Sequence, residues 1–161
     1  MNNNDILRRL RYTFNFRDTK IIELFALFEH EVSKEKVIAW LKKEDEPAYV
    51  EIYDKELAIF LSALIIEKRG KRDGEQPKPE KSLDNNIIFR KLKIALNFRD
   101  DDIMDVFHLA RFKISKHELS AIFRKPGQNQ YRKCKDQFLR NFLIGLQLKY
   151  KKKEEPNKNK N

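Results

Sequence analysis

Basic side chains crowd one short stretch in the second half of the chain. Residues 124–135 read RKPGQNQYRKCK, with five Lys or Arg and no acidic residue. Cations at this density can neutralise the phosphates of a nucleic acid backbone. The candidate phosphate contacts are Lys116, Arg124, Lys125, Arg132, Lys133 and Lys135. The alternative is that these residues form only a solvated face of a Lys-rich protein.

Catalytic patterns are missing from the rest of the sequence. His30, His108 and His117 have no metal-ligand spacing with each other or with Cys134, the single cysteine. Four glycines, two of them within residues 70–82, leave no loop that would cradle a phosphate. We therefore expect a protein that is not an enzyme, that holds no cofactor or metal, and that has no evident small-molecule substrate.

The elements that position the basic cluster come from an internal duplication. The tetrapeptide NFRD at residues 15–18 recurs at residues 97–100, and a shift of 82 positions aligns the flanking sequence without a gap. About a third of the aligned positions are identical, and most of these are apolar or helix-capping residues. Cys134 aligns with Ile52, which predicts a buried small side chain and not a reactive thiol.

Each copy predicts a unit of roughly four helices, so the fold class is all-α with two tandem copies. Apolar residues recur at helical spacing in four segments of each copy. The predicted N-caps of the first copy are Asn4 or Asp5, Asp18, Ser33 and Asp54, with Ser115 and Asp136 repeating the last two. Asn15 and Asn97 are expected in the left-handed conformation, with Phe16 and Phe98 buried at equivalent corners.

Composition predicts four segments along the chain. The first repeat covers residues 1–69 and the second covers residues 83–150. Residues 70–82 contain two Gly, two Pro and alternating charges, which is typical of a linker. Residues 151–161, KKKEEPNKNKN, are too polar to pack, so we expect a disordered basic tail.

The second and third helices of each copy resemble a helix-turn-helix pair. In the first copy, residues 18–43 would place Lys34, Glu35, Lys36 and Trp40 on the second helix of the pair. The usual glycine of the turn is absent, and helix pairs joined by short turns are common in helical bundles. Contact with phosphates, without recognition of bases, is therefore the favoured form of nucleic acid binding.

The two copies differ most in charge. Residues 1–69 hold 12 Lys or Arg against 13 Asp or Glu, whereas residues 83–150 hold 14 against 7. The acidic stretch KKEDEPAYVEI at residues 42–52 aligns with the basic stretch that begins at Arg124. The sequence therefore predicts a non-enzymatic binding module whose second repeat contacts nucleic acid.

The fourth helix of the first copy suggests a different function. Residues 56–68, ELAIFLSALIIEK, are apolar on nearly every side, and such a helix must be covered all round. The extra apolar positions that mark the covered side are Ala58, Ile59, Ile65 and Ile66. Either the second repeat or another protein chain, including a second copy of this one, would cover them.

Three features stand out in the duplicated arrangement: EVSKEKVIAWLKKEDEP at residues 31–47, DIL near the start and the two R-D turns. With these features the chain resembles, over nearly its whole length, the YehS-like family of bacterial proteins. The resemblance implies two tandem copies of a domain of unknown function in a bacterial protein, and it carries no catalytic or binding residue.

Localisation follows from features that the sequence lacks. No apolar run approaches the roughly 20 residues needed to cross a bilayer. The opening residues MNNNDILRRL do not show the order of a signal peptide. A single cysteine agrees with a reducing compartment. We therefore expect a cytoplasmic protein without a membrane partner.

Overall fold

The computed structural model describes residues 1–152 and shows eight helices and no strand in that part of the chain. The all-α prediction is confirmed. The helices are α1 (Asn3–Phe14), α2 (Asp18–Ala26), α3 (Lys34–Leu41), α4 (Asp54–Arg69), α5 (Asn85–Leu96), α6 (Asp100–Leu109), α7 (Lys116–Ile122) and α8 (Asp136–Lys152). Helix α8 ends two residues beyond the predicted end of the second repeat, and the remainder of the predicted tail lies outside the described residues.

The backbone repeats the duplication seen in the sequence. Helices α1 to α4 have their counterparts in α5 to α8. The non-glycine residues with positive φ form three pairs at the same offset of 82 positions, namely Asn15 and Asn97, Glu29 and Arg111, and Ala48 and Gln130. The left-handed conformation expected at Asn15 and Asn97 is confirmed, with φ of 56° and 55°.

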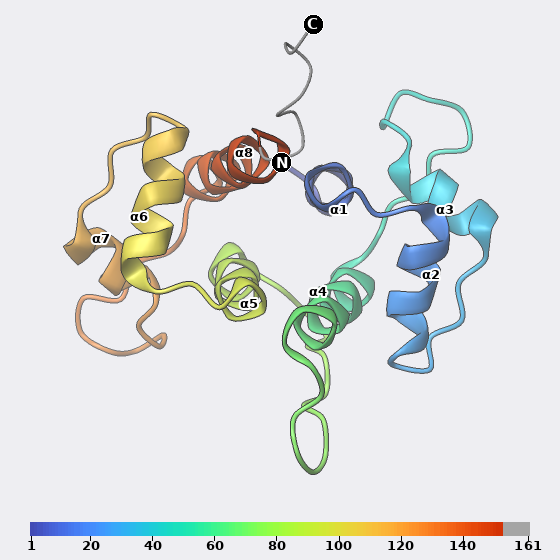
Figure 1. The fold of residues 1–161 in the computed structure, drawn as a ribbon, viewed down its shortest axis with the longest axis horizontal. Helices are drawn as coiled ribbons and strands as arrows, with labels where there is room; N and C mark the ends of the chain where they lie inside the picture. Colours follow the sequence, from blue (N-terminus) through green and yellow to red (C-terminus); the bar gives the residue numbers. More distant parts are fainter. Residues whose placement is uncertain (153–161) are drawn as a thin grey trace, which may run out of the picture.

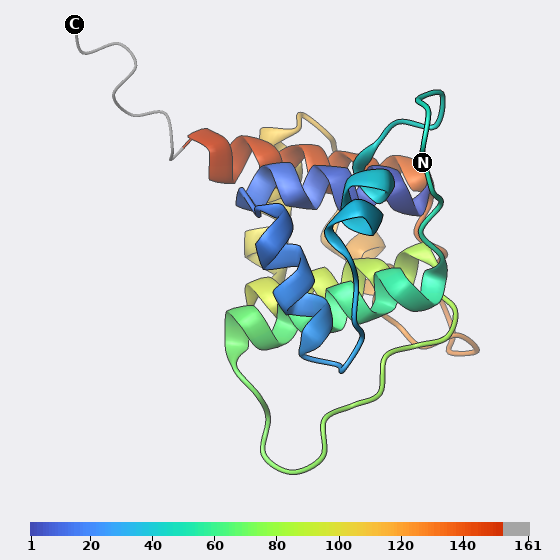
Figure 2. The same cartoon turned by 90° about the vertical axis from the view of Figure 1, so that its right-hand side faces the viewer.

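The two repeats pack through a reciprocal exchange of helix contacts. Helix α1 lies beside α8, and α4 lies beside α5, as Figures 1 and 2 both show. In each contact the first helix of one repeat meets the fourth helix of the other. The pairs α2–α3 and α6–α7 flank this central layer on opposite sides (Figure 1). The arrangement is that of an interface with two-fold symmetry, formed here within one chain.

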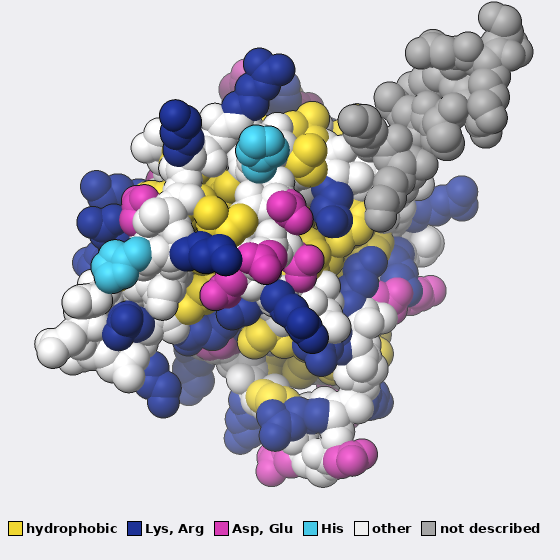
Figure 3. Space-filling model, turned by 60° about the vertical axis from the view of Figure 1, so that its left-hand side comes forward, with side chains coloured by type: hydrophobic (Ala, Val, Ile, Leu, Met, Phe, Trp, Pro, Cys, Tyr) yellow, Lys and Arg dark blue, Asp and Glu magenta, His cyan; other side chains and the backbone are white. Residues whose placement is uncertain are grey.

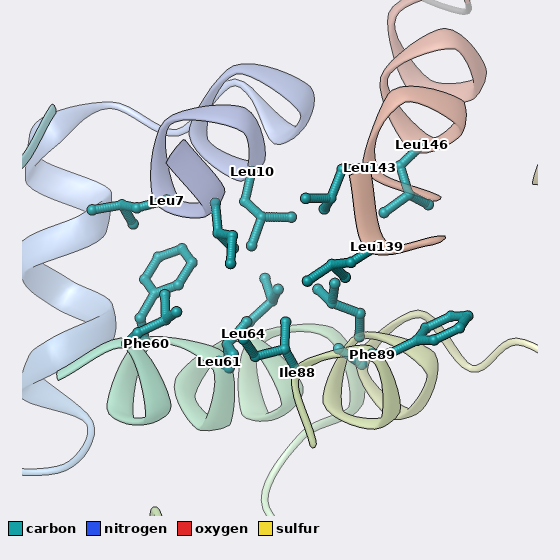
Figure 4. Packing of buried hydrophobic residues seen from close by; sticks show 14 of the residues in the cluster. Leu7, Leu10, Phe60, Leu61, Leu64, Ile88, Phe89, Leu139, Leu143 and Leu146 are labelled. Carbon is teal, nitrogen blue, oxygen red and sulfur yellow. The ribbon is translucent and has the colours of Figure 1, made fainter. Parts of the chain in front are cut away.

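A single apolar core lies between the four central helices. Figure 4 shows leucines of α1 and α8 facing side chains of α4 and α5 across this core. Leu10, Leu64, Ile88 and Leu143, one from each helix, are each at most 3% exposed. Because the buried cluster is continuous across both repeats, each repeat completes the core of the other.

Phe16 and Phe98 occupy equivalent corners, but they are half-buried and not fully buried as the sequence predicted. Their ring centroids lie 6.4 Å from the rings of Phe60 and Phe142 respectively. Each phenylalanine sits in the turn between two helices at the edge of the core, so it covers a buried ring on one side and meets solvent on the other.

The predicted helix caps are right at the serines and wrong elsewhere. Ser33 and Ser115 accept hydrogen bonds from the backbone nitrogens of Lys36 and Glu118 at 3.1 and 3.0 Å. The N-cap of α1 is Asn2, and neither Asn4 nor Asp5 has that role. Asp18, Asp54 and Asp136 are the first residues inside their helices, not caps. Carboxylates in the first turn still stabilise the helix, because they interact with the positive end of its dipole.

Candidate binding surfaces

One buried asparagine in each repeat anchors the long loop before the fourth helix. The Asn86 side-chain amide donates to the carbonyls of Ile122 and Arg132, both at 3.0 Å, and its oxygen accepts from the Cys134 nitrogen at 2.8 Å. Asn4 makes the same three contacts in the first repeat, with Trp40, Val50 and Ile52. The identity of Asn4 and Asn86 was visible in the sequence, but its long-range role was not.

The loop anchored by Asn86 carries most of the predicted phosphate contacts. This α7–α8 loop, residues 123–135, contains Arg124, Lys125, Arg132, Lys133 and Lys135. Lys125, Lys133 and Lys135 are exposed, and within the described chain no carboxylate lies within ion-pair distance of them. The three lysines therefore present uncompensated positive charge from a loop whose backbone is fixed.

The other basic candidates already have partners. Arg132 lies 3.4 Å from a carboxylate oxygen of Glu118, and Lys116 stands apart on α7, 3.0 Å from Asp101 of α6. These pairs are largely exposed, so solvent screens them and a phosphate can compete for the cations. Arg124 is half-buried and donates to the Asn129 carbonyl at 3.4 Å, which turns its guanidinium back on its own loop.

The surface around α6 and α7 carries both signs of charge. Figure 3 brings this side of the molecule forward and shows Lys and Arg side chains spread over it, with Asp and Glu side chains gathered between them. The acidic first turn of α6, Asp100, Asp101 and Asp102, contributes negative charge to this half of the molecule. On this side of the molecule the α7–α8 loop is therefore a better candidate for anion contact than α6.

Two of the four positions of the predicted interface on α4 are buried within the single chain. Ala58 and Ile59 are 0% and 6% exposed, and α5 packs along α4. Ile65 and Ile66, nearer the end of α4, are half-buried. Packing within the chain thus covers the first half of the predicted positions, whereas Ile65 and Ile66 remain partly accessible.

Ile65 and Ile66 line a groove of about 570 Å³ between α4, α5 and the linker, which we call the linker groove. Apolar side chains form much of its wall, including Phe28, Pro77, Ile87 and Ile94, while Arg69, Lys71, Arg72, Arg90 and Lys91 add positive charge. The Lys91 ammonium donates to the Ser62 hydroxyl at 2.7 Å and pairs with Glu80 at 2.8 Å.

The linker groove is not evident from the sequence because its walls come from segments far apart in the chain. The sequence feature that could have indicated the groove is a difference in polarity between aligned positions of the two copies. Ile87 and Ile94 align with Asp5 and Tyr12, so α5 carries apolar residues where α1 is polar.

Cys134 is buried, as predicted from its alignment with Ile52. Its side chain is 4% exposed, and Ile52 is 1% exposed at the equivalent place. Burial is the main cause that raises the pKa of the Cys134 thiol to about 12, with the nearby carboxylates of Asp136 and Asp84 adding to it. The thiol therefore stays protonated at neutral pH and behaves as a small apolar side chain.

In residues 1–152 no three His, Cys, Asp or Glu side chains gather closely enough to hold a metal ion. No helix in the same range combines the length and the apolar character needed to cross a bilayer.

Comparison with known proteins places the duplication in a family. The family described as "Protein of unknown function (DUF1456)" matches residues 3–70 and again residues 85–152, two segments offset by the same 82 positions. The chain belongs to this family. A relative from Escherichia coli (strain K12), titled "Uncharacterized protein YehS", is 40% identical over 147 residues, which is 91% of this chain and 94% of the relative. The resemblance to the YehS-like family is thereby confirmed.

No solved structure is significantly similar to this chain.

Proposed function

We propose that the protein is a non-enzymatic binding module that contacts nucleic acid phosphates through the α7–α8 loop. The observation that supports this proposal is the set of three exposed lysines, Lys125, Lys133 and Lys135, which have no carboxylate partner in the described chain. A fixed loop backbone places their charges without a large loss of conformational entropy on binding. The proposal includes a cytoplasmic location, where such a partner is available.

The first repeat has an equivalent loop with the same backbone but without the basic charge. The α3–α4 loop has the same backbone anchor, Asn4, and the same left-handed residue position, Ala48, but it carries Glu44, Asp45 and Glu46. The basic character is thus not required by the fold. Side chains that the fold does not require are the ones that function can select.

The proposed contacts are to phosphates and not to bases. Trp40, on the second helix of the helix-turn-helix-like pair, is 0% exposed and packs 5.2 Å from the ring of Phe25. It is therefore not available for stacking or base contact. The segment between α2 and α3 spans residues 27–33, longer than the three or four residues of a typical helix-turn-helix connection.

Fluorescence anisotropy with labelled single-stranded and duplex DNA and RNA in low salt tests this proposal. We expect dissociation constants in the range of about 10⁻⁴ to 10⁻⁶ M that weaken steeply as salt is added. The triple variant Lys125→Gln, Lys133→Gln, Lys135→Gln should bind at least tenfold more weakly and should lower the slope of log K against log salt by up to about 3.

The matched control removes three exposed lysines elsewhere, by Lys34→Gln, Lys55→Gln and Lys78→Gln. Both triple variants have the same net charge, so only a local site distinguishes them. Absence of binding to any of the four nucleic acids at micromolar protein would contradict the proposal. Equal weakening by the two variants would reduce the effect to non-specific attraction by net charge.

The alternative function, protein interaction through α4, has less support. Ala58 and Ile59 are already buried in the single chain, so these two positions offer no free surface to a second protein. Ile65 and Ile66 border the linker groove, where the space available suits a small ligand better than a protein surface.

A further inference from the structure

The linker groove has a counterpart on the other side of the two-fold arrangement. A second groove of about 510 Å³ lies between α1 and α8, and we call it the α1–α8 groove. Several of its lining residues are 82 positions away from residues of the linker groove. Arg8, Arg9, Tyr12 and Gln147 line the α1–α8 groove where Arg90, Lys91, Ile94 and Ile65 line the linker groove.

The two grooves share one pair of basic positions and differ at other positions of their lining. Each has a pair of adjacent cations on the first helix of a repeat, Arg8 and Arg9 or Arg90 and Lys91. The polar residues Tyr12 and Gln147 are replaced by Ile94 and Ile65 in the linker groove. The linker groove thus combines cationic and strongly apolar walls, and residues of the linker itself form part of its lining.

A cation lies at the inner wall of this apolar space. The Lys91 side chain is only 12% exposed, and its ammonium contacts the Ser62 hydroxyl and the Glu80 carboxylate. A lysine this far from water requires an anionic partner. Glu80 comes from the linker, is 36% exposed, and is the one acidic side chain among the described residues that line the groove. The carboxylate on Lys91 is therefore on a segment at the surface and not on the packed helices.

We propose that the linker groove binds a small amphipathic carboxylate, with a single aliphatic chain and an anionic head. The chain would pack against Ile65, Ile66 and Ile94, where it removes apolar surface from water. The carboxylate would take the place of Glu80 on Lys91, in a charge-assisted hydrogen bond of the same chemistry. The four arginines and lysines around Lys91 disfavour a cationic head in the same groove.

Decanoate is a suitable probe, titrated into the full-length protein by isothermal calorimetry below its micelle concentration. We expect one binding site per chain. Decyltrimethylammonium has the same chain with a cationic head, and butyrate has the same head with too short a chain, so both should bind at least tenfold more weakly. In a methyl NMR spectrum, decanoate should shift the signals of Ile65, Ile66, Ile87 and Ile94, which line the groove.

Three substitutions test the two parts of the site. Lys91→Gln should weaken decanoate binding at least tenfold, and Ile65→Gln, which introduces the residue found in the α1–α8 groove, should weaken it several-fold. Glu80→Gln should strengthen binding several-fold because it removes the competing carboxylate. Arg9→Gln is the matched control, since Arg9 is the counterpart of Lys91, and it should leave the affinity unchanged.

Several outcomes would overturn the proposal. They are an absence of decanoate binding to the natural sequence, equal binding of decanoate and decyltrimethylammonium, equal loss of affinity in Lys91→Gln and Arg9→Gln, and methyl shifts located away from the groove. Thermal unfolding of each variant verifies its fold. If Lys91→Gln fails to fold, Ile65→Gln decides the question, because its side chain is half-exposed and replaceable.

Discussion

A carboxylate oxygen of Asp54, Oδ2, accepts a hydrogen bond from the backbone nitrogen of Leu83 at 2.9 Å, which ties the start of α4 to the end of the linker. The equivalent aspartate of the second repeat, Asp136, lies 3.6 Å from the α-amino nitrogen of Met1, and Met1 aligns with Leu83. Each aspartate thus contacts the first residue of the other copy. These two contacts follow the same reciprocal pattern as the packing of the first helix of each repeat against the fourth helix of the other.

Separating the repeats should therefore expose core on both sides. We expect residues 1–70 expressed alone to self-associate or to lose helicity, because Ala58 and Ile59 would lose the cover of α5. Mixing this fragment with residues 83–152 should restore helicity in a one-to-one complex. Circular dichroism and sedimentation measure both effects. A first repeat that stays folded and monomeric by itself would contradict the shared core.

Replacing the loop anchors should cost more stability than their small size suggests. Asn86→Ala and Asn4→Ala each remove three long-range hydrogen bonds to backbone groups inside the protein. We expect each to lower the free energy of unfolding in urea by about 2–4 kcal/mol, since buried backbone groups lose their partners. The control is Asn141→Ala, at a half-buried position where the side-chain amide donates only to the Gln137 carbonyl of its own helix, and it should change the free energy by less than about 0.5 kcal/mol. Similar losses of unfolding free energy in all three variants would contradict the anchoring role of Asn4 and Asn86.

Gly145 should not tolerate the usual stabilising change to alanine. A Cβ atom at this position would lie 2.2 Å from the carbonyl oxygen of Val106, where α8 meets α6. Alanine favours an isolated helix by about 1 kcal/mol relative to glycine, but overlap with a backbone atom forces the helices apart. We expect Gly145→Ala to destabilise the protein by about 1–3 kcal/mol in thermal unfolding. Ser120→Ala, on the exposed side of α7, is the control, and a stabilised Gly145→Ala would show that the two helices separate easily.

Cys134 should react with a thiol reagent only after unfolding. Burial raises its pKa from 9.0 to about 12, so at pH 8 the folded protein holds the unreactive thiol form. The folded state binds this proton more tightly than the unfolded state does. The resulting stabilisation is fully present below about pH 9 and is lost as the pH rises toward 12. The difference in stability between the natural protein and Cys134→Ala, measured across that range, isolates the effect from other titrating groups. Rapid labelling of the folded protein at pH 8 would contradict the assignment.

Much of the local structure was predictable from the sequence by itself. The offset of 82 positions, the serine caps at Ser33 and Ser115, the left-handed Asn15 and Asn97, and the burial of Cys134 all follow from short-range rules or from comparing the two copies. Such rules work because a cap or a turn involves residues only a few positions apart, so the residue types involved appear together in the sequence.

Two of the corrections, at Asn4 and Asp54, share one physical cause. The sequence predicts Asn4 as a helix cap, yet the partners of Asn4 and of its counterpart Asn86 lie 36 to 48 positions away along the chain. Asp54 was assigned as a cap, while its carboxylate accepts from Leu83, 29 positions away. A polar residue near a helix start fits the sequence rule for a cap whether its side chain caps the helix or makes a long-range hydrogen bond instead. Only the packed chain shows which hydrogen-bond partner lies close enough.

What the sequence determined about this protein is the number, the order and the repetition of its helices. The tertiary structure decided that α5 packs along α4, that Lys125, Lys133 and Lys135 lack carboxylate partners in the described chain, and that Lys91 pairs with Glu80 beside an apolar wall. The reason is that the need to bury an apolar face is encoded along a single helix, whereas the identity of the covering surface depends on which arrangement buries all such faces at once.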